Sequence, residues 1–143
     1  MPGYYDSSFL LASLLDQPGR DKLVPLWDNE PIRVSSILLE AECLTVLRRA
    51  AASQPVTDGE PFLALRMNCL EQYLAAVSLK NHDEEVNRCL RNEKQLGLCR
   101  TLDAIHLATA ILFQEQFDSP LTICSLNKQM REVAATIGFT VAP

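Results

Sequence analysis

The chain has 143 residues, 48% of them hydrophobic, and a formal net charge of −5. This length is most economically one domain, which we expect to span residues 1–143, and the hydrophobic content is too high for a disordered chain. The negative charge argues against a broadly basic surface for nucleic acid, although a bound metal ion can itself supply positive charge to a phosphate.

Neither a membrane segment nor a zinc site is expected. No apolar run approaches the roughly 20 residues that span a bilayer, and the first residues contain no basic stretch typical of a signal peptide. The five cysteines are odd in number and form no Cys-x-x-Cys pair, which is typical of reduced thiols. We therefore expect a cytoplasmic protein.

Strands and helices are expected to alternate along the chain, judging from apolar periodicity, turn residues and helix caps. The first predicted elements are, in order, a strand at 3–6, helices at 9–15 and 20–29, a strand at 32–34 and a helix at 37–52. A helix with Pro61 in its first turn then runs to about Tyr73 and is followed by a strand at 74–79. The last predicted elements are helices at 83–92 and from a Thr101 cap to before Pro120, a strand at 121–124, a helix at 128–137 and an edge strand at 139–141. Ser7 or Ser8 is expected to cap the first helix. Ser35 or Ser36 has the same expected role at the third helix, and Gly138 is expected to end the last.

This alternation predicts an α/β fold in which helices cover both faces of a central, mostly parallel sheet of four to five strands. Ligands of such sheets bind beyond the carboxyl ends of the strands, where the strand order reverses. Asp6 ends the first strand, Asn127 follows the strand at 121–124, and Asp103 lies in the first turn of its helix. These positions can meet at one rim of the sheet.

Three isolated acids lie in otherwise apolar segments. They are Asp6 after Tyr4-Tyr5, Glu42 within residues 37–44, and Asp103 within residues 102–110. A carboxylate that is buried without a partner is strongly destabilising, so each of these acids needs a cation or a proton. Acids on three separate elements therefore indicate a shared site for a divalent metal ion, and oxygen ligands suit Mg²⁺ or Mn²⁺.

The order of these segments resembles the PIN-domain family and, within it, the VapC-type toxin ribonucleases. The matching segments cover nearly the whole chain and are Tyr5-Asp6-Ser7-Ser8, Ser36 with Glu42, Leu102 to Ala110, Ser125-Leu126-Asn127-Lys128, Ala134-Ala135 and Gly138 to Val141. The resemblance implies a PIN-like α/β/α sandwich and a Mg²⁺- or Mn²⁺-dependent endoribonuclease that hydrolyses RNA phosphodiester bonds. In that enzyme Asp6, Glu42 and Asp103 bind the metal ion and activate water. Toxins of this type pair with a small antitoxin protein whose tail covers the acidic groove, and they commonly form homodimers.

One position departs from the family pattern. The family usually has Thr/Ser-x-Asp after the fourth strand, where this chain has Ser125-Leu126-Asn127. Asn127 can still offer a carbonyl oxygen to the metal ion or to its water, so we include it as the fourth site residue. Because an amide brings no charge, a second metal ion should bind more weakly.

The site residues also have purely structural interpretations. Asp6 can cap the helix that follows it, and Glu42 can form a partly buried ion pair with Arg49. Asp103 can stabilise the first turn of its own helix through the helix dipole. Asn127 can cap the helix after it, an interpretation about as strong as a metal contact through water.

Basic and imidazole side chains near these acids have less direct expected roles. His106, three residues after Asp103, is expected to orient a neighbour or satisfy a buried hydrogen bond rather than bind metal. Three basic residues could contact phosphate, although such residues on helices are mostly solvated, and they are Arg48, Arg49 and Lys128.

Two other functions compete with the nuclease. A degenerate PIN domain with weak or no nuclease activity would act as an RNA- or protein-binding module, and Asn127 favours this alternative. A metal phosphatase acting on a small phosphoester could use the same acids, but the Asp-x-Asp-x-(Thr/Val) motif is absent and we rank it last.

Overall fold

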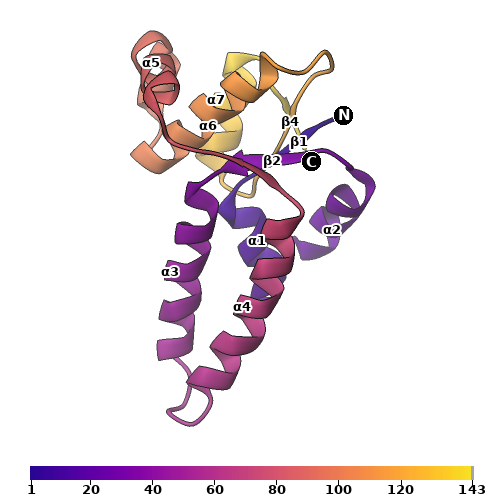
Figure 1. The fold of residues 1–143 in the computed structure, drawn as a ribbon, viewed down its shortest axis with the longest axis vertical. Coiled ribbons are helices and arrows are strands. Elements are labelled where there is room, and N and C mark those ends of the chain that lie inside the picture. The colour runs from indigo at the N-terminus through magenta and orange to yellow at the C-terminus, as the bar shows by residue number, and fades with distance from the viewer. Residues whose placement is uncertain (143) are drawn as a thin grey trace.

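A computed structural model describes residues 1–142 of the chain (Figure 1). Pro143, the last residue of the predicted domain, lies outside the described residues. In chain order the elements are β1 (Gly3–Tyr5), α1 (Ser7–Leu14), α2 (Arg20–Asn29), β2 (Arg33–Ser36), α3 (Leu38–Ala52), α4 (Gly59–Ala75), β3 (Ser78–Lys80), α5 (Glu84–Asn92), the short 3-10 helix η1 (Lys94–Leu98), α6 (Thr101–Gln114), β4 (Thr122–Cys124), α7 (Lys128–Ile137) and β5 (Thr140–Val141).

The strands form one sheet in the order β3-β2-β1-β4-β5, and every neighbouring pair is parallel. The predicted α/β fold with a mostly parallel sheet of four to five strands is confirmed. From β1 the chain adds β2 and β3 on one side, and later β4 and β5 on the other. The strand order therefore reverses between β1 and β4, whose register pairs Tyr4 with Ile123 and Tyr5 with Cys124.

Helices cover both faces of the sheet, with α1 to α4 on one face and α5 to α7 on the other (Figure 1). β1 contributes to both cores because successive strand residues point to opposite faces. Tyr4 is buried in the core that α5, α6 and α7 complete, whereas Tyr5 is buried in the core shared by α1 to α4. Both cores therefore meet at the strand that leads directly to Asp6.

The region of the third strand differs from its prediction. The predicted strand at 74–79 is wrong in its first half, because α4 continues to Ala75 and β3 comprises only Ser78–Lys80. Leu70 and Leu74 lie one helical turn apart, and both pack into the core beside α1 and α3. The end of this apolar helical face was mistaken for the start of a strand, since periodicity over a few residues does not distinguish the two. The helix η1 was not predicted.

Two helix starts also differ in detail. Of the predicted serine pair, Ser36 contacts the start of α3, where its hydroxyl oxygen accepts the Leu38 N–H at 3.1 Å. At α6 the predicted Thr101 cap is wrong, because Arg100 has the N-cap position and Thr101 is already helical. Gly138 ends α7 as predicted, in the left-handed conformation with φ of 109°.

Among the helices of residues 1–142, none is long and apolar enough to cross a membrane. All five cysteines are unpaired thiols.

Candidate active site

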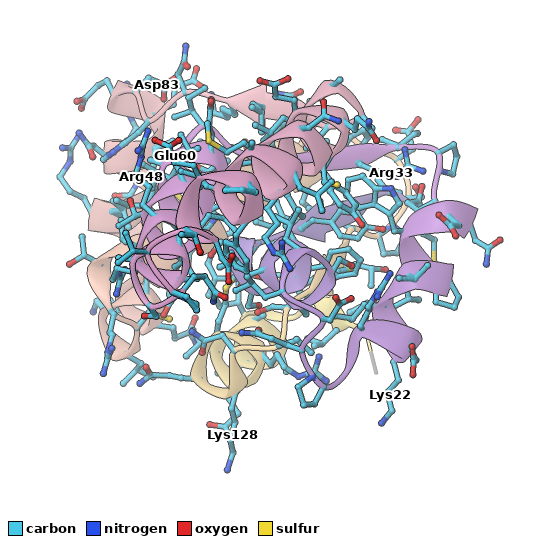
Figure 2. The ribbon with its side chains drawn as sticks, turned by 90° about the horizontal axis from the view of Figure 1, so that it is seen from below. Lys22, Arg33, Arg48, Glu60, Asp83 and Lys128 are labelled. Atoms are coloured by element: carbon cyan, nitrogen blue, oxygen red, sulfur yellow. The ribbon has the colours of Figure 1, made fainter. Side chains whose placement is uncertain are left out.

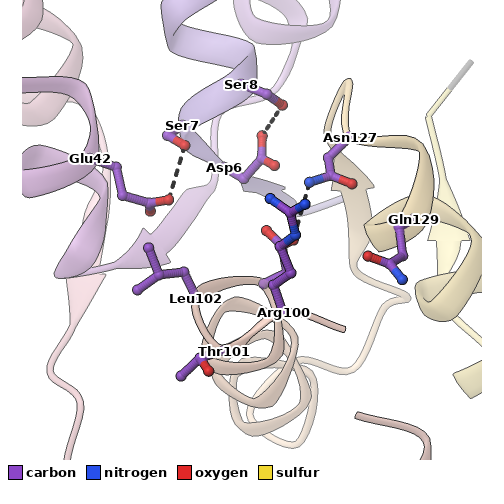
Figure 3. Close-up of a pocket in the computed structure, with 10 residues that line it drawn as sticks. Asp6, Ser7, Ser8, Glu42, Arg100, Thr101, Leu102, Asn127 and Gln129 are labelled. Carbon is purple, nitrogen blue, oxygen red and sulfur yellow. Dashed lines mark hydrogen bonds between the residues drawn. The ribbon is translucent and has the colours of Figure 1, made fainter. Parts of the chain in front are cut away.

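A pocket of about 550 Å³ opens at the carboxyl ends of β1 and β4, where the strand order reverses (Figure 3). Its lining comes from α1, α3, α6, α7 and the residues that cap them, and consists of Asp6, Ser7, Ser8, Glu42, Arg100, Thr101, Leu102, Asp103, Asn127 and Gln129. The four residues predicted to converge are all present, namely Asp6, Glu42, Asp103 and Asn127. Their convergence is therefore confirmed, whereas their role in metal binding stays a prediction.

Asp6 follows β1 directly and is only 4% exposed. Its Oδ1 accepts hydrogen bonds from the Ser8 hydroxyl at 2.6 Å and from the Phe9 N–H at 3.3 Å. Its Oδ2 accepts one from the Ser125 hydroxyl at 2.6 Å. Burial raises the pKa of Asp6 above its ordinary value, although these donors act in the opposite direction. Asp6 is thus the cap of α1, in place of the serines predicted for that role, and its carboxylate also lines the pocket.

Glu42 reaches the pocket from α3. The Ser7 hydroxyl donates to Oε2 at 3.3 Å, and Oε1 contacts Nε2 of His106. Within residues 1–142 the side chain that pairs with Glu42 is His106, which is charged only when protonated, and not Arg49, so the alternative pairing with Arg49 is wrong. His106 is buried, and its Nδ1 lies 2.7 Å from the Tyr4 hydroxyl. As predicted, His106 satisfies a buried hydrogen bond, the one with Tyr4, and it also contacts Glu42 of the candidate site.

Asp103 and Asn127 are joined by a hydrogen bond, in which Nδ2 of Asn127 donates to Oδ2 of Asp103 at 3.2 Å. Oδ1 of Asn127 accepts the Met130 N–H at 3.0 Å, so Asn127 caps α7. The cap interpretation of Asn127 is therefore correct, and the amide turns its NH₂ group toward Asp103. Burial raises the pKa of Asp103, and the Glu42 carboxylate adds to this effect.

The donor set of the pocket fits a hydrated, hard metal ion. Oxygen atoms of carboxylates, hydroxyls and amides dominate its polar lining, and two of its acids have raised pKa values because their charged forms lack full compensation. Within residues 1–142, no three His, Cys, Asp or Glu side chains lie close enough to hold a metal ion together. Mg²⁺ commonly keeps several waters and uses one or two carboxylates plus substrate phosphate. The acids therefore suit Mg²⁺ or Mn²⁺ held partly through water.

Arg100 is the one basic residue among those that line the pocket. It precedes α6, three residues before Asp103, and Figure 3 shows its guanidinium extending toward the space between Asp6 and Asn127. Arg100 was not among the predicted phosphate contacts, although a basic residue directly ahead of the Asp103 helix was an available signal. Lys128, which was among them, has a side chain that is 89% exposed and extends outward from α7 (Figure 2).

An apolar groove of about 300 Å³ adjoins the pocket. It is lined by Ser7, Leu38, Ala41, Glu42, Thr45, Val46, Arg49 and Leu102. Ser7, Glu42 and Leu102 belong to both linings, so the groove and the acidic pocket are continuous. Of the other predicted phosphate contacts, Arg49 lines this groove together with Glu42, whereas Arg48 belongs to neither lining.

Two serines that hold the site together were missed as functional residues. The Ser8 and Ser125 hydroxyl oxygens lie 3.3 Å apart, and each donates to a different oxygen of Asp6. Ser125 also accepts the Asn127 N–H at 3.0 Å, and Ser8 accepts the Leu126 N–H at 2.8 Å. These contacts tie the segment after β4 to the start of α1. Both serines lie in segments on which the family resemblance was based, and this was the signal that could have identified them.

A sequence model of the PIN domain matches residues 4–135 of the chain. The matched range begins in β1, ends in α7 and includes every residue that lines the acidic pocket. A search of curated proteins finds no match. The assignment to the PIN-domain family thus has support from a family model. The VapC subgroup depends on the resemblance of the motifs alone.

Proposed function

Because the chain belongs to the PIN-domain family, whose members are typically metal-dependent nucleases, we propose that it is an endoribonuclease of the VapC toxin type. The observation that carries the proposal is the pocket at the reversal of strand order. There the acids Asp6, Glu42 and Asp103 meet beside Asn127. The proposed substrate is RNA, and the proposed reaction is hydrolysis of a phosphodiester bond.

The proposed role of the three acids is to bind the metal ion. Asp6, Glu42 and Asp103 would hold Mg²⁺ or Mn²⁺, directly or through its waters. The bound ion supplies a water of lowered pKa and positive charge for the phosphate. Ser8 and Ser125 fix both oxygens of Asp6, so this carboxylate is already oriented before a metal ion arrives.

Arg100 is the proposed contact to the RNA phosphate. A guanidinium can donate two parallel hydrogen bonds to a phosphate and keeps its charge at any physiological pH. Its position between Asp6 and Asn127 would place that phosphate over the acids (Figure 3). In a chain with a net charge of −5, a local cation is also needed to offset repulsion of the polyanion.

The proposed protein partner is a small antitoxin, supported by the groove beside the pocket. Leu38, Val46 and Leu102 give this groove apolar walls. Glu42 lies where the groove joins the acidic pocket. A partner segment with apolar side chains could bind the groove and extend a tail over the acids, as the VapC resemblance implies. A homodimer is proposed on the same resemblance, and the exposed Leu65 on α4 supports a further apolar contact. We place the protein in the cytoplasm, where its unpaired cysteines would stay reduced.

The second candidate function is a binding module with weak or no nuclease activity. It is favoured by Asn127, because the amide oxygen caps α7 and the NH₂ group faces Asp103. In that arrangement Asn127 provides neither charge nor a free oxygen to a metal ion. Such a module would bind RNA or a protein at the same pocket without cutting it.

Cleavage of a panel of structured RNAs by the full chain tests the proposal. We expect cleavage that requires Mg²⁺ or Mn²⁺, stops with a chelator and is lost in Asp6→Asn and in Asp103→Asn. Glu60→Gln, an exposed acid on α4, is the matched control and should cut like the wild type (Figure 2). RNA binding without cleavage at any metal concentration would favour the binding module, and neither binding nor cleavage would reject both functions. Co-purification with the product of a short neighbouring reading frame would test the antitoxin separately.

A further inference from the structure

Tyr4 and His106 form a buried polar pair behind the acidic pocket. The Tyr4 hydroxyl lies 2.7 Å from Nδ1 of His106, and their rings meet edge to face with centroids 5.8 Å apart. Tyr4 is 0% exposed and His106 is 1% exposed, so neither side chain lines the pocket. They come from β1 and α6, the elements that also lead to Asp6 and carry Asp103. They reach the pocket by a hydrogen bond through the side chain that His106 contacts.

That side chain is Glu42, whose carboxylate can only accept hydrogen bonds, and this assigns the donors along the contact. A phenol carries one proton, which the buried Tyr4 hydroxyl can donate to Nδ1 of His106. Nδ1 is then an acceptor, so the imidazole proton lies on Nε2 and is donated to Oε1 of Glu42. The chain Tyr4 to His106 to Glu42 is therefore a relay of neutral donors. It orients the carboxylate and leaves its negative charge available to a cation.

Glu42 needs such support more than the other acids. Its side chain has one more rotatable bond than an aspartate and loses more conformational freedom when it is fixed. It also comes from α3, on the opposite side of the sheet from α6. Oε2 has only a 3.3 Å hydrogen bond from Ser7, whereas Asp6 has two donors at 2.6 Å. His106 is thus the principal restraint on where the Glu42 carboxylate lies.

We propose that Tyr4 and His106 are positioning residues for the metal site, with His106 holding the Glu42 carboxylate at the pocket and Tyr4 fixing the tautomer that makes this possible. The inference rests on the proposed function, because it assigns Glu42 to the binding of Mg²⁺ or Mn²⁺. Loss of a hydrogen-bond partner behind a ligand typically weakens metal affinity by about 10- to 100-fold.

Titration of the purified full chain with Mn²⁺, followed by the paramagnetic signal of the free ion, measures this without reference to cleavage. His106→Leu removes the donor, and we expect its Kd for Mn²⁺ to rise by about 10- to 100-fold. His106→Gln keeps an N–H donor where Nε2 lies and should recover much of the affinity. Tyr4→Phe removes only the hydroxyl and should give a smaller loss. His82→Leu, at the exposed second histidine, is the matched control and should bind like the wild type.

A double-mutant cycle separates positioning from a general effect on the core. If His106 acts through Glu42, then His106→Leu should not weaken Mn²⁺ binding further in a chain that already has Glu42→Gln. Additive losses would overturn the inference, as would equal affinities in the wild type and His106→Leu. If His106→Leu does not fold, the comparison of Tyr4→Phe with the wild type decides, and equal affinities there overturn it. Failure of the wild type to bind Mn²⁺ would reject the metal site itself, which is a different result from an unchanged variant.

Discussion

Asn127 stands where the family pattern has an acid, and its two hydrogen bonds define what a substitution there would do. Oδ1 is used by the cap of α7 and Nδ2 by the bond to Asp103. An aspartate could keep the cap with one oxygen, because Asp and Asn are similarly good caps. Its other oxygen would then face Asp103 and present negative charge to the pocket.

We predict that Asn127→Asp increases RNA cleavage, most clearly at low metal concentration, because a charged fourth oxygen strengthens the binding of a second metal ion. The measurement is the cleavage rate as a function of Mn²⁺ concentration. An unchanged rate would mean that residue 127 is only a helix cap. A lower rate at saturating Mn²⁺ would mean that the amide N–H is itself required, for instance as the donor to Asp103.

Arg100 allows a prediction about RNA binding that is separate from the metal. Removal of one phosphate contact should weaken RNA binding similarly across RNA sequences. It should also reduce the salt dependence of binding, which is the magnitude of the slope of log K against log [salt], by about one unit. We expect this for Arg100→Ala when binding of a single-stranded RNA is measured across salt concentrations. Arg91→Ala is the control, since Arg91 is exposed on α5 and pairs with Glu84. A salt slope that is the same in both variants would remove Arg100 from the phosphate contact.

The raised pKa of Asp103 predicts how the stability of the metal-free protein depends on pH. Its pKa is raised in the folded state, so folding favours the protonated form. The resulting stabilisation is fully present below the unfolded pKa, about 3.9, and is lost as the pH rises through the folded pKa. We therefore expect Asp103→Asn to be more stable than the wild type at neutral pH, and this difference to shrink as the pH falls toward 4. Urea unfolding at both pH values, with a chelator present, measures it, and an equal or larger difference at acidic pH would contradict the assignment.

The residues of the site were predictable to different degrees. Asp6, Glu42 and Asp103 could be found because an isolated acid in an apolar segment is conspicuous in sequence. Tyr4 could not, because an apolar strand explains it fully until the His106 contact is seen. The orientation of Asn127 was also beyond the sequence, since cap and metal contact call for the same residue type and only the hydrogen bonds distinguish them.

At the scale of elements, the end of α7 depends on one backbone conformation. Gly138 has φ of 109°, and its N–H donates to the carbonyls of Ala134 and Ala135. A Cβ added there would meet nothing within 4 Å, so any cost of a side chain comes from the left-handed conformation and not from a clash. That conformation is unfavourable for residues other than glycine by roughly 1–2 kcal/mol.

We predict that Gly138→Ala destabilises the fold by about 1 kcal/mol in urea unfolding. Gly97→Ala is the matched control. A Cβ there would also meet nothing within 4 Å, but Gly97 lies in η1 without a positive φ. It should be neutral or slightly stabilising, because alanine restricts the unfolded chain. Equal losses at the two sites would mean that the backbone conformation is not the cause.

The elements with strong local signals were predicted well, and the errors occur where local signals conflict. The bounds of α2 and α7 match their predictions because proline, asparagine and glycine mark their ends. The start of β3 was misplaced because α4 continues its apolar face to Leu74, and only the packing against α1 and α3 identifies those residues as helical. Sequence periodicity therefore located the helix but not the point where the sheet resumes.

At the scale of the whole molecule, strand order creates the site. Alternating elements predict a parallel sheet, but sequence does not state that β1 lies between β2 and β4. That order brings the segment after β4 to the start of α1, and α6 then closes the pocket with Asp103. The prediction that the acids converge depended on their placement on separate apolar elements and on the general rule for parallel sheets, and the strand order supplies the physical reason that they meet.

The final prediction concerns the stability of the whole chain. A metal ion that binds only the folded state stabilises it by RT ln(1 + [L]/Kd), or about 2.7 kcal/mol at a hundred times Kd. For a domain of this size we expect Tm to rise by roughly 5–10 °C under those conditions. The rise should be seen with Mg²⁺ and Mn²⁺ in a thermal unfolding series and should be abolished in Asp103→Asn, while Glu60→Gln keeps it.

The effect should weaken as the pH falls, because protons compete with the metal ion for Asp6 and Asp103, whose pKa values are raised by burial. A flat Tm across millimolar metal would count against a metal site in this pocket, and a rise that persists in Asp103→Asn would place the ion elsewhere.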